Sequence, residues 1–211
     1  MNLNCLKKKN YFRYIQIKNF KNTIIEELSL IFLFEIEILK ILTTITEPTL
    51  KKIRYQWIIE EIENEKENLI IVSKLLTLQK KEKIKHDIIN ILSNFRDFEF
   101  NFSNIDDIVV FFKKNNQIFN KIFTTLTMKE EDPFSISFSS QLIYFFYLRQ
   151  YIEDEISKKL LIFYESSKFK SDNYVEASFM RLFFIKISKK KKLKISKLEF
   201  IFNLFLSLLK R

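Results

Sequence analysis

The stretch Thr23 to Thr44 reads TIIEELSLIFLFEIEILKILTT, and it decides the fold class. Its apolar residues recur at spacings of three and four and cover nearly every side of a helix. A helix that is apolar all round lies in the middle of a protein. Because Glu35 and Glu37 interrupt the run, it falls short of the ~20 apolar residues of a membrane span. The stretch therefore predicts a central core helix.

Helical patterns continue along the chain on the C-terminal side of this stretch. Thr46-Glu47-Pro48 predicts a helix start, with a hydroxyl cap, an acid in the first turn and proline near the N-terminus. This helix is expected to end near Glu67. Four of its residues are expected to face the core: Leu50, Ile53, Trp57 and Ile58. A short apolar segment at 68–78 and helices at 82–98, 105–127, 133–165, 174–188 and 197–209 follow, with polar loops at 128–135 and 166–173.

No strand-like alternation is long enough to compete with these helical patterns. The sequence therefore predicts an all-α, single-domain helical bundle. A basic N-terminal segment, residues 1–22, is expected to precede a helical domain formed by residues 23–211.

The composition excludes several kinds of site. The chain has no glycine, which a Walker loop, a Rossmann turn and a nucleophile elbow all require. One cysteine and one histidine cannot form a structural zinc site or a disulfide framework. The single thiol, Cys5, and the lack of a secretory pattern favour a cytoplasmic location.

The net charge is +10, and the chain is rich in Ile, Lys, Phe and Asn, whose codons are AT-rich. Because an AT-biased genome raises lysine content by itself, the charge does not predict nucleic-acid binding. A local cluster, Lys189, Lys190, Lys191 and Lys192, has two interpretations: a solvated linker or a contact with an anionic membrane surface at the inner membrane face. It lacks the arginines and aromatics that are typical of a nucleic-acid site.

Three features of the segment 30–60 stand in a fixed order. Phe34 and Glu37 lie three apart in an aromatic-rich helix, Thr46-Glu47-Pro48 opens the next helix, and Arg54-x-Gln56-Trp57 follows. In this order and spacing the segment resembles the squalene/phytoene synthase family. Weaker similarity continues over most of the chain, at 96–99, 141–163 and 179–211.

The resemblance implies the all-α isoprenoid synthase fold and an enzyme that joins two prenyl diphosphates head to head. In that family two Asp-rich motifs hold Mg²⁺ against the diphosphate. The first motif falls at 39–43 here, where no carboxylate stands; the second falls at 150–154, where two acids remain. The metal candidates are Glu37, Glu153 and Asp154, and the substrate-binding candidates are Lys40, Arg54, Gln56, Trp57 and Arg149. No catalytic residue is assigned.

Some relatives keep the fold and the Arg-x-Gln-Trp signature but lose the first Asp motif. They include the family's mitochondrial complex I assembly factor and proteins of alphaproteobacteria, and this sequence looks most similar to that group. The resemblance then implies a protein without the usual prenyl transfer and without a resident cofactor. It would bind a prenyl diphosphate or another lipid, or help a protein partner to assemble, near a membrane.

Two alternatives stay open at this point. The first is an active Mg²⁺-dependent prenyl-diphosphate transferase, which requires Glu37, Glu153 and Asp154 to meet in one cavity; a cavity that receives Lys40 favours binding without turnover. The second is a structural role for the signature, with Trp57 filling the core and Arg54 or Gln56 joining helices through buried hydrogen bonds.

Overall fold

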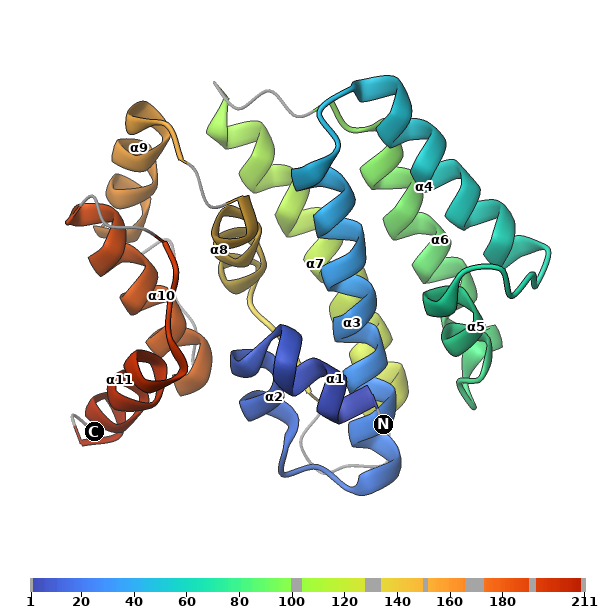
Figure 1. Ribbon diagram of the computed structural model, residues 1–211, viewed down its shortest axis with the longest axis horizontal. Helices are drawn as coiled ribbons and strands as arrows, with labels where there is room; N and C mark the ends of the chain where they lie inside the picture. Colours follow the sequence, from blue (N-terminus) through green and yellow to red (C-terminus); the bar gives the residue numbers. More distant parts are fainter. Residues whose placement is uncertain are drawn as a thin grey trace. The chain divides into compact units, whose positions relative to one another are not determined.

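The computed structural model describes residues 2–99, 104–127, 134–149, 152–165, 173–189 and 193–209, and this part of the chain is helical without strands (Figure 1). The predicted all-α class is confirmed. The helices are α1 (Asn2–Lys9), α2 (Tyr11–Ile17), α3 (Asn22–Thr44), α4 (Pro48–Glu63), α5 (Ile70–Leu76), α6 (Lys81–Asp97), α7 (Ile105–Thr127), α8 (Phe138–Arg149), α9 (Asp154–Glu165), α10 (Tyr174–Ser188) and α11 (Lys197–Leu209).

The chain forms two compact units. Unit 1 consists of residues 1–99 and 114–135, and unit 2 consists of residues 100–113 and 136–211. Helix α7 contributes its first turns to unit 2 and the rest to unit 1.

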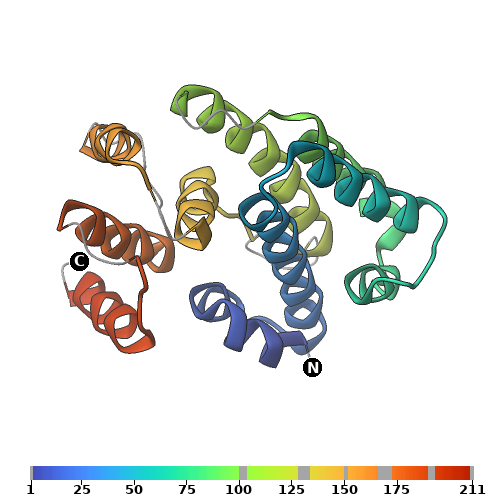
Figure 2. The ribbon, with the colours of Figure 1, turned by 45° about the horizontal axis from the view of Figure 1, so that its top comes forward.

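Helix α3 is the centre of unit 1. It contacts α1 and α2 as well as α4, α5 and α6, and Figure 2 shows it between the first pair and α4. Most of its residues are buried, among them Phe32 and Phe34 with at most 1% of their surface exposed. Phe32 packs against Phe123 of α7 and Phe134, with ring centroids 5.1 and 5.9 Å away. The prediction of a central core helix at 23–44 is thus confirmed.

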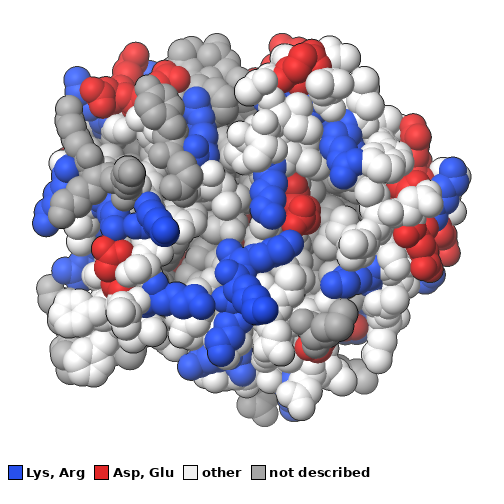
Figure 3. Space-filling view, viewed as in Figure 1, with Lys and Arg blue, Asp and Glu red and all other residues white. Residues whose placement is uncertain are grey.

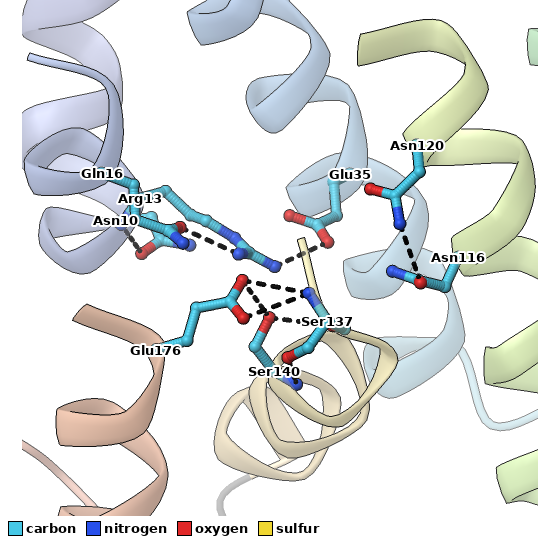
Figure 4. A network of polar contacts seen from close by, with 9 residues as sticks. All are labelled: Asn10, Arg13, Gln16, Glu35, Asn116, Asn120, Ser137, Ser140 and Glu176. Atoms are coloured by element: carbon cyan, nitrogen blue, oxygen red, sulfur yellow. Dashed lines mark hydrogen bonds and ion pairs between the residues drawn. The ribbon is translucent and has the colours of Figure 1, made fainter. Parts of the chain in front are cut away.

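The basic segment expected at 1–22 contains α1 and α2, and a buried ion pair joins α2 to α3. The Arg13 guanidinium lies 3.2 Å from a carboxylate oxygen of Glu35, and both side chains are at most 1% exposed (Figure 4). Arg13 also donates a hydrogen bond of 2.9 Å to Gln16 and lies over the rings of Phe12 and Phe32. This charged pair therefore belongs to the core of unit 1.

The register of α4 corrects one prediction. Leu50, Ile53 and Trp57 are 55%, 58% and 40% exposed, whereas Ile58 is buried as expected. The buried stripe is Tyr55, Ile58, Ile59 and Ile62, which repeats at three and four and lies on one side of the helix. The Tyr55 hydroxyl donates a 2.8 Å hydrogen bond to the Ile38 carbonyl of α3. The core aromatic residue of this helix is thus Tyr55, and the expectation that Trp57 fills the core was wrong.

The ends of α4 also differ from the prediction. Glu47, and not the hydroxyl of Thr46, caps the helix: its carboxylate accepts hydrogen bonds from the backbone N–H groups of Thr49 and Leu50. The helix ends at Glu63 rather than near Glu67. Glu65 has a φ of 51°, in the left-handed region that glycine usually occupies. In a chain without glycine, a non-glycine residue must take this position.

Unit 2 is built around α10, which contacts α8, α9 and α11. Glu176 of α10 is fully buried and accepts hydrogen bonds from the Ser140 hydroxyl at 2.8 Å and from the backbone N–H of Ser137 (Figure 4). Tyr164 of α9 stacks on Phe184 of α10, with ring centroids 4.1 Å apart. The helices predicted at 174–188 and 197–209 are confirmed with these bounds, as is the capping box of Ser196 and Glu199.

The single helix expected at 133–165 was wrong. The chain forms α8 and α9, and Ile152 and Glu153 lie outside both helices. The Glu153 carbonyl accepts the first hydrogen bond of α9, from Ser157, and Asp154 and Glu155 occupy the first turn. Acidic residues are favourable at a helix N-terminus, so this run starts a helix instead of continuing one. The start expected at Asp132-Pro133, most of the loop expected at 128–135 and nearly all of that at 166–173 lie outside the described residues.

Candidate functional site

Unit 1 contains a cavity of ≈ 420 Å³ that opens to solvent. This volume falls in the ~300–1,000 Å³ range of small-molecule sites. We call it the unit 1 pocket. It is lined from α1 by Cys5 and Lys9, from α3 by Leu33, Glu37 and Ile41, from α4 by Arg54 and Ile58, and from α5 and the residues before it by Asn68, Leu69, Ile70, Ile71 and Lys74. Two of the predicted site residues, Glu37 and Arg54, therefore line one cavity.

A buried carboxylate shapes the α5 side of this pocket. Glu61 is 3% exposed, and it accepts hydrogen bonds from the backbone N–H of Asn68 at 3.1 Å and from its side-chain amide at 2.9 Å. These bonds fix the connection between α4 and α5. They thereby place Leu69 and Ile70 at the pocket wall.

The Glu37 carboxylate forms ion pairs with two lysines. Its carboxylate accepts a hydrogen bond of 2.9 Å from Lys9 and lies 3.4 Å from the ammonium of Lys40. Burial raises the pKa of Glu37, but the Lys9 hydrogen bond and the charges of Lys40 and Lys9 outweigh it, so the net pKa is lowered. The hydrogen bond to Glu37 in turn raises the pKa of Lys9, and it outweighs the partial burial that lowers this pKa. Glu37 is therefore an ionised member of a cationic cluster at neutral pH.

The pocket does not fit a magnesium ion. Mg²⁺ prefers an octahedron of oxygen ligands, usually one or two carboxylates with waters and substrate phosphates. Among the described residues, Glu37 supplies the only carboxylate in the lining, and ammonium groups are paired with it. In the part of the chain that the structure describes, no cluster of three or more His, Cys, Asp or Glu could hold a metal ion.

Two further cations line the pocket without a carboxylate partner. The guanidinium of Arg54 lies over the ring of Trp57, 4.4 Å from its centroid, and within the described residues no ion pair or hydrogen bond engages it. The ammonium of Lys74 likewise has no acidic partner there. Both side chains are half-buried against apolar residues. With Lys9, the pocket presents three cations against one carboxylate, which is the charge pattern of an anion site.

Gln56 and Trp57 lie on a different surface of α4. Together with Lys52, Ile53, Glu60 and Arg96 they line a shallow groove between α4 and α6. Arg96 donates a 2.6 Å hydrogen bond to the Gln56 side-chain oxygen, and it also pairs with Asp97 at 2.7 Å. Gln56 thus joins two helices, in line with the structural alternative for this residue. Of the Arg-x-Gln-Trp signature, only Arg54 lines the pocket.

The remaining predicted site residues belong to unit 2. Arg149 lies 3.6 Å from Glu153, so one candidate metal ligand faces a cation, and Asp154 stands in the first turn of α9. Lys189 is exposed at the C-terminal end of α10, and Lys190, Lys191 and Lys192 lie outside the described residues. The proposed set of Glu37, Glu153 and Asp154 thus draws on both units and stays a prediction.

The sequence prediction missed the apolar wall of the pocket and also four lining residues with polar or ionisable side chains: Cys5, Lys9, Asn68 and Lys74. They come from short helices and a connection without a distinctive motif. The amphipathic pattern of α1 and α5 could have placed them near α3, but not at one cavity.

Neither family models, nor curated proteins, nor solved structures match the chain. Within the described residues, no helix is both long and apolar enough to cross a bilayer.

Proposed function

We propose that the protein is a non-enzymatic binding module and that the unit 1 pocket holds a small amphiphile with an anionic head group. The observation that carries this proposal is the pairing of an apolar wall with two cations, Arg54 and Lys74, that lack an acidic partner in the described part of the chain. A half-buried cation in an apolar setting is costly until an anion neutralises it.

The head group is the part of the ligand that Arg54 and Lys74 recognise. A guanidinium presents several N–H donors in a plane and binds phosphate or carboxylate oxygens in pairs, while an ammonium acts as a point charge. Stacking on Trp57 restricts the Arg54 guanidinium, and this lowers the entropy that it loses on binding. A phosphate or diphosphate matches this pair of cations in charge.

The tail of the ligand contacts the apolar wall formed by Leu33, Ile41, Ile58, Leu69 and Ile71. Burial of an alkyl or prenyl chain contributes ~0.8 kcal/mol per CH₂ group. Affinity should therefore increase with chain length and hardly depend on Mg²⁺, because the lining does not fit that ion.

The proposal includes descent from the squalene/phytoene synthase family, with the isoprenoid synthase fold, and loss of prenyl transfer. Its support is the resemblance at 30–60 together with the consecutive helices α3 and α4, which bring Glu37 and Arg54 to one pocket. Prenyl transfer needs a metal clamp on the departing diphosphate, whereas Glu37 is bound to Lys9 and Lys40. The protein would then carry a prenyl diphosphate or lipid near a membrane surface and present it to an assembly partner.

The test is a calorimetric titration with farnesyl diphosphate, farnesol and inorganic diphosphate. We expect farnesyl diphosphate to bind most tightly, because it alone of the three has both an anionic head group and an apolar tail. Arg54→Gln and Lys74→Gln should each weaken its binding by about 10- to 100-fold, since a charge-assisted hydrogen bond contributes ~1.5–3 kcal/mol.

The matched controls are Lys83→Gln and Lys66→Gln, which remove the same charge from exposed positions outside the pocket lining. They should leave the affinity within about twofold, because screened surface charges act weakly. Equal losses in the pocket and control variants would mean that only net charge attracts the ligand, and the proposal would be wrong. Binding of farnesol as tight as that of farnesyl diphosphate would also contradict it.

A further inference from the structure

Helix α11 exposes a continuous apolar stripe. Leu198, Ile201, Phe202 and Phe205 are 80%, 44%, 62% and 58% exposed, and their spacing of three and four places them on one side of the helix. Water-exposed clusters of large apolar side chains mark interaction surfaces. The stripe is therefore a candidate interaction surface.

The opposite side of α11 is fixed to unit 2. Phe200 is 3% exposed, and α11 packs along α10. The Glu199 carboxylate lies 2.8 Å from the ammonium of Lys186 and accepts a 2.8 Å hydrogen bond from the backbone of Ser196. These contacts hold the helix in place while its apolar stripe faces outward.

The surroundings of the stripe are basic. Lys197 opens α11, Lys189 and Lys194 precede it in the sequence, and all three are exposed. The sequence carries six lysines from position 189 to position 197. The one acid between Lys186 and Asn203 in the sequence is Glu199, which pairs with Lys186. In Figure 3 the surface over α11, at the lower left, is mostly uncharged.

We infer that α11 binds the surface of an anionic bilayer, with Leu198, Phe202 and Phe205 inserted below the head groups. An amphipathic helix with Phe and Leu on one side and lysines at its border is typical of interfacial binding. The lysines select anionic lipid over a neutral apolar partner such as a protein groove. This inference deepens the proposed location near a membrane and rests on it, but it does not depend on the unit 1 pocket.

The test is flotation of the full chain with vesicles of phosphatidylcholine and phosphatidylserine, and with vesicles of pure phosphatidylcholine. We expect binding to the mixed vesicles only, and a loss of at least about tenfold in Phe202→Ser/Phe205→Ser, because apolar burial drives insertion. The matched control is Val110→Ser: Val110 is 65% exposed, but the first turn of its helix carries Asp106 and Asp107. This control should leave vesicle binding unchanged.

A depth probe separates insertion from simple charge attraction. Trp57→Phe removes the single tryptophan, and Phe202→Trp in that background reports on the stripe. We expect a blue shift of its emission and quenching by brominated lipid on vesicle binding. Vesicle binding without quenching would show attraction by charge alone and would overturn the inference. A dimer of the chain that Phe202→Ser converts to monomer would overturn it as well, because the stripe would then bind a second copy. If vesicle binding fails while farnesyl diphosphate still binds, the inference on α11 is wrong and the proposed pocket stands.

Discussion

Tyr55→Ala is expected to lower the free energy of unfolding by ~3–5 kcal/mol, the usual range for a large aromatic residue removed from a core. The ring of Tyr55 is fully buried, and its hydroxyl bonds to the carbonyl of Ile38. Burial also raises its pKa well above the ordinary value for tyrosine. Trp57→Ala, by contrast, should cost clearly less than Tyr55→Ala, because Trp57 is 40% exposed and its truncation leaves no buried cavity.

The measurement is urea denaturation of both variants followed by circular dichroism. Tyr55→Phe separates the two contributions of this residue: it keeps the ring and loses only the hydrogen bond to Ile38, for about 1 kcal/mol. If Trp57→Ala proved the more destabilising of the two alanine variants, the register of α4 given above would be wrong.

Removal of either partner of the buried pair Arg13–Glu35 is expected to destabilise unit 1 by ~3–5 kcal/mol, because the remaining buried charge loses an attraction that offsets the cost of its desolvation. Arg13→Met and Glu35→Leu are the single variants. The double variant should recover most of the loss, since apolar side chains of similar volume can replace a buried ion pair. Thermal denaturation of the four proteins gives the coupling energy.

The exposed pair Lys85–Glu65, at 3.3 Å, provides the matched control. Lys85→Met should cost less than ~1 kcal/mol, because water already screens this pair. Additive losses in the Arg13–Glu35 cycle would show that the two side chains do not stabilise each other, contrary to the structure.

Helices whose boundaries carry strong local signals could be predicted from the sequence. Asn22–Thr44 follows from its apolar run, and Lys197–Leu209 follows from the capping box of Ser196 and Glu199. The buried face of α4 could not be predicted in this way, because apolar residues occur on several sides of the helix. Only contact with α3 selects Tyr55 over Trp57 as the buried aromatic residue. The break between α8 and α9 could not be predicted from periodicity, because no glycine or proline marks it and its local signal is only the acids of the first turn of α9, Asp154 and Glu155.

The candidate site could be predicted only in part from the sequence. The resemblance singled out Glu37 and Arg54, and both line the unit 1 pocket. Lys9 and Lys74 give the pocket lining its excess of cations over carboxylates, yet they come from α1 and α5, far from the motif in sequence. Such partners depend on tertiary packing, which local periodicity does not specify.

The affinity of Glu37→Gln for farnesyl diphosphate, measured with Mg²⁺ and with EDTA, tests whether the unit 1 pocket binds an anion without a metal ion. If the pocket binds the anion directly, loss of the Glu37 charge frees Lys9, which lines the pocket, and removes a negative charge that repels the ligand. The affinity should then rise by about threefold to fivefold, the equivalent of the ~0.5–1 kcal/mol of an exposed ion pair, and be the same with and without Mg²⁺. An affinity that falls in Glu37→Gln, together with wild-type binding that requires Mg²⁺, would show that Glu37 is a metal ligand and would contradict the account.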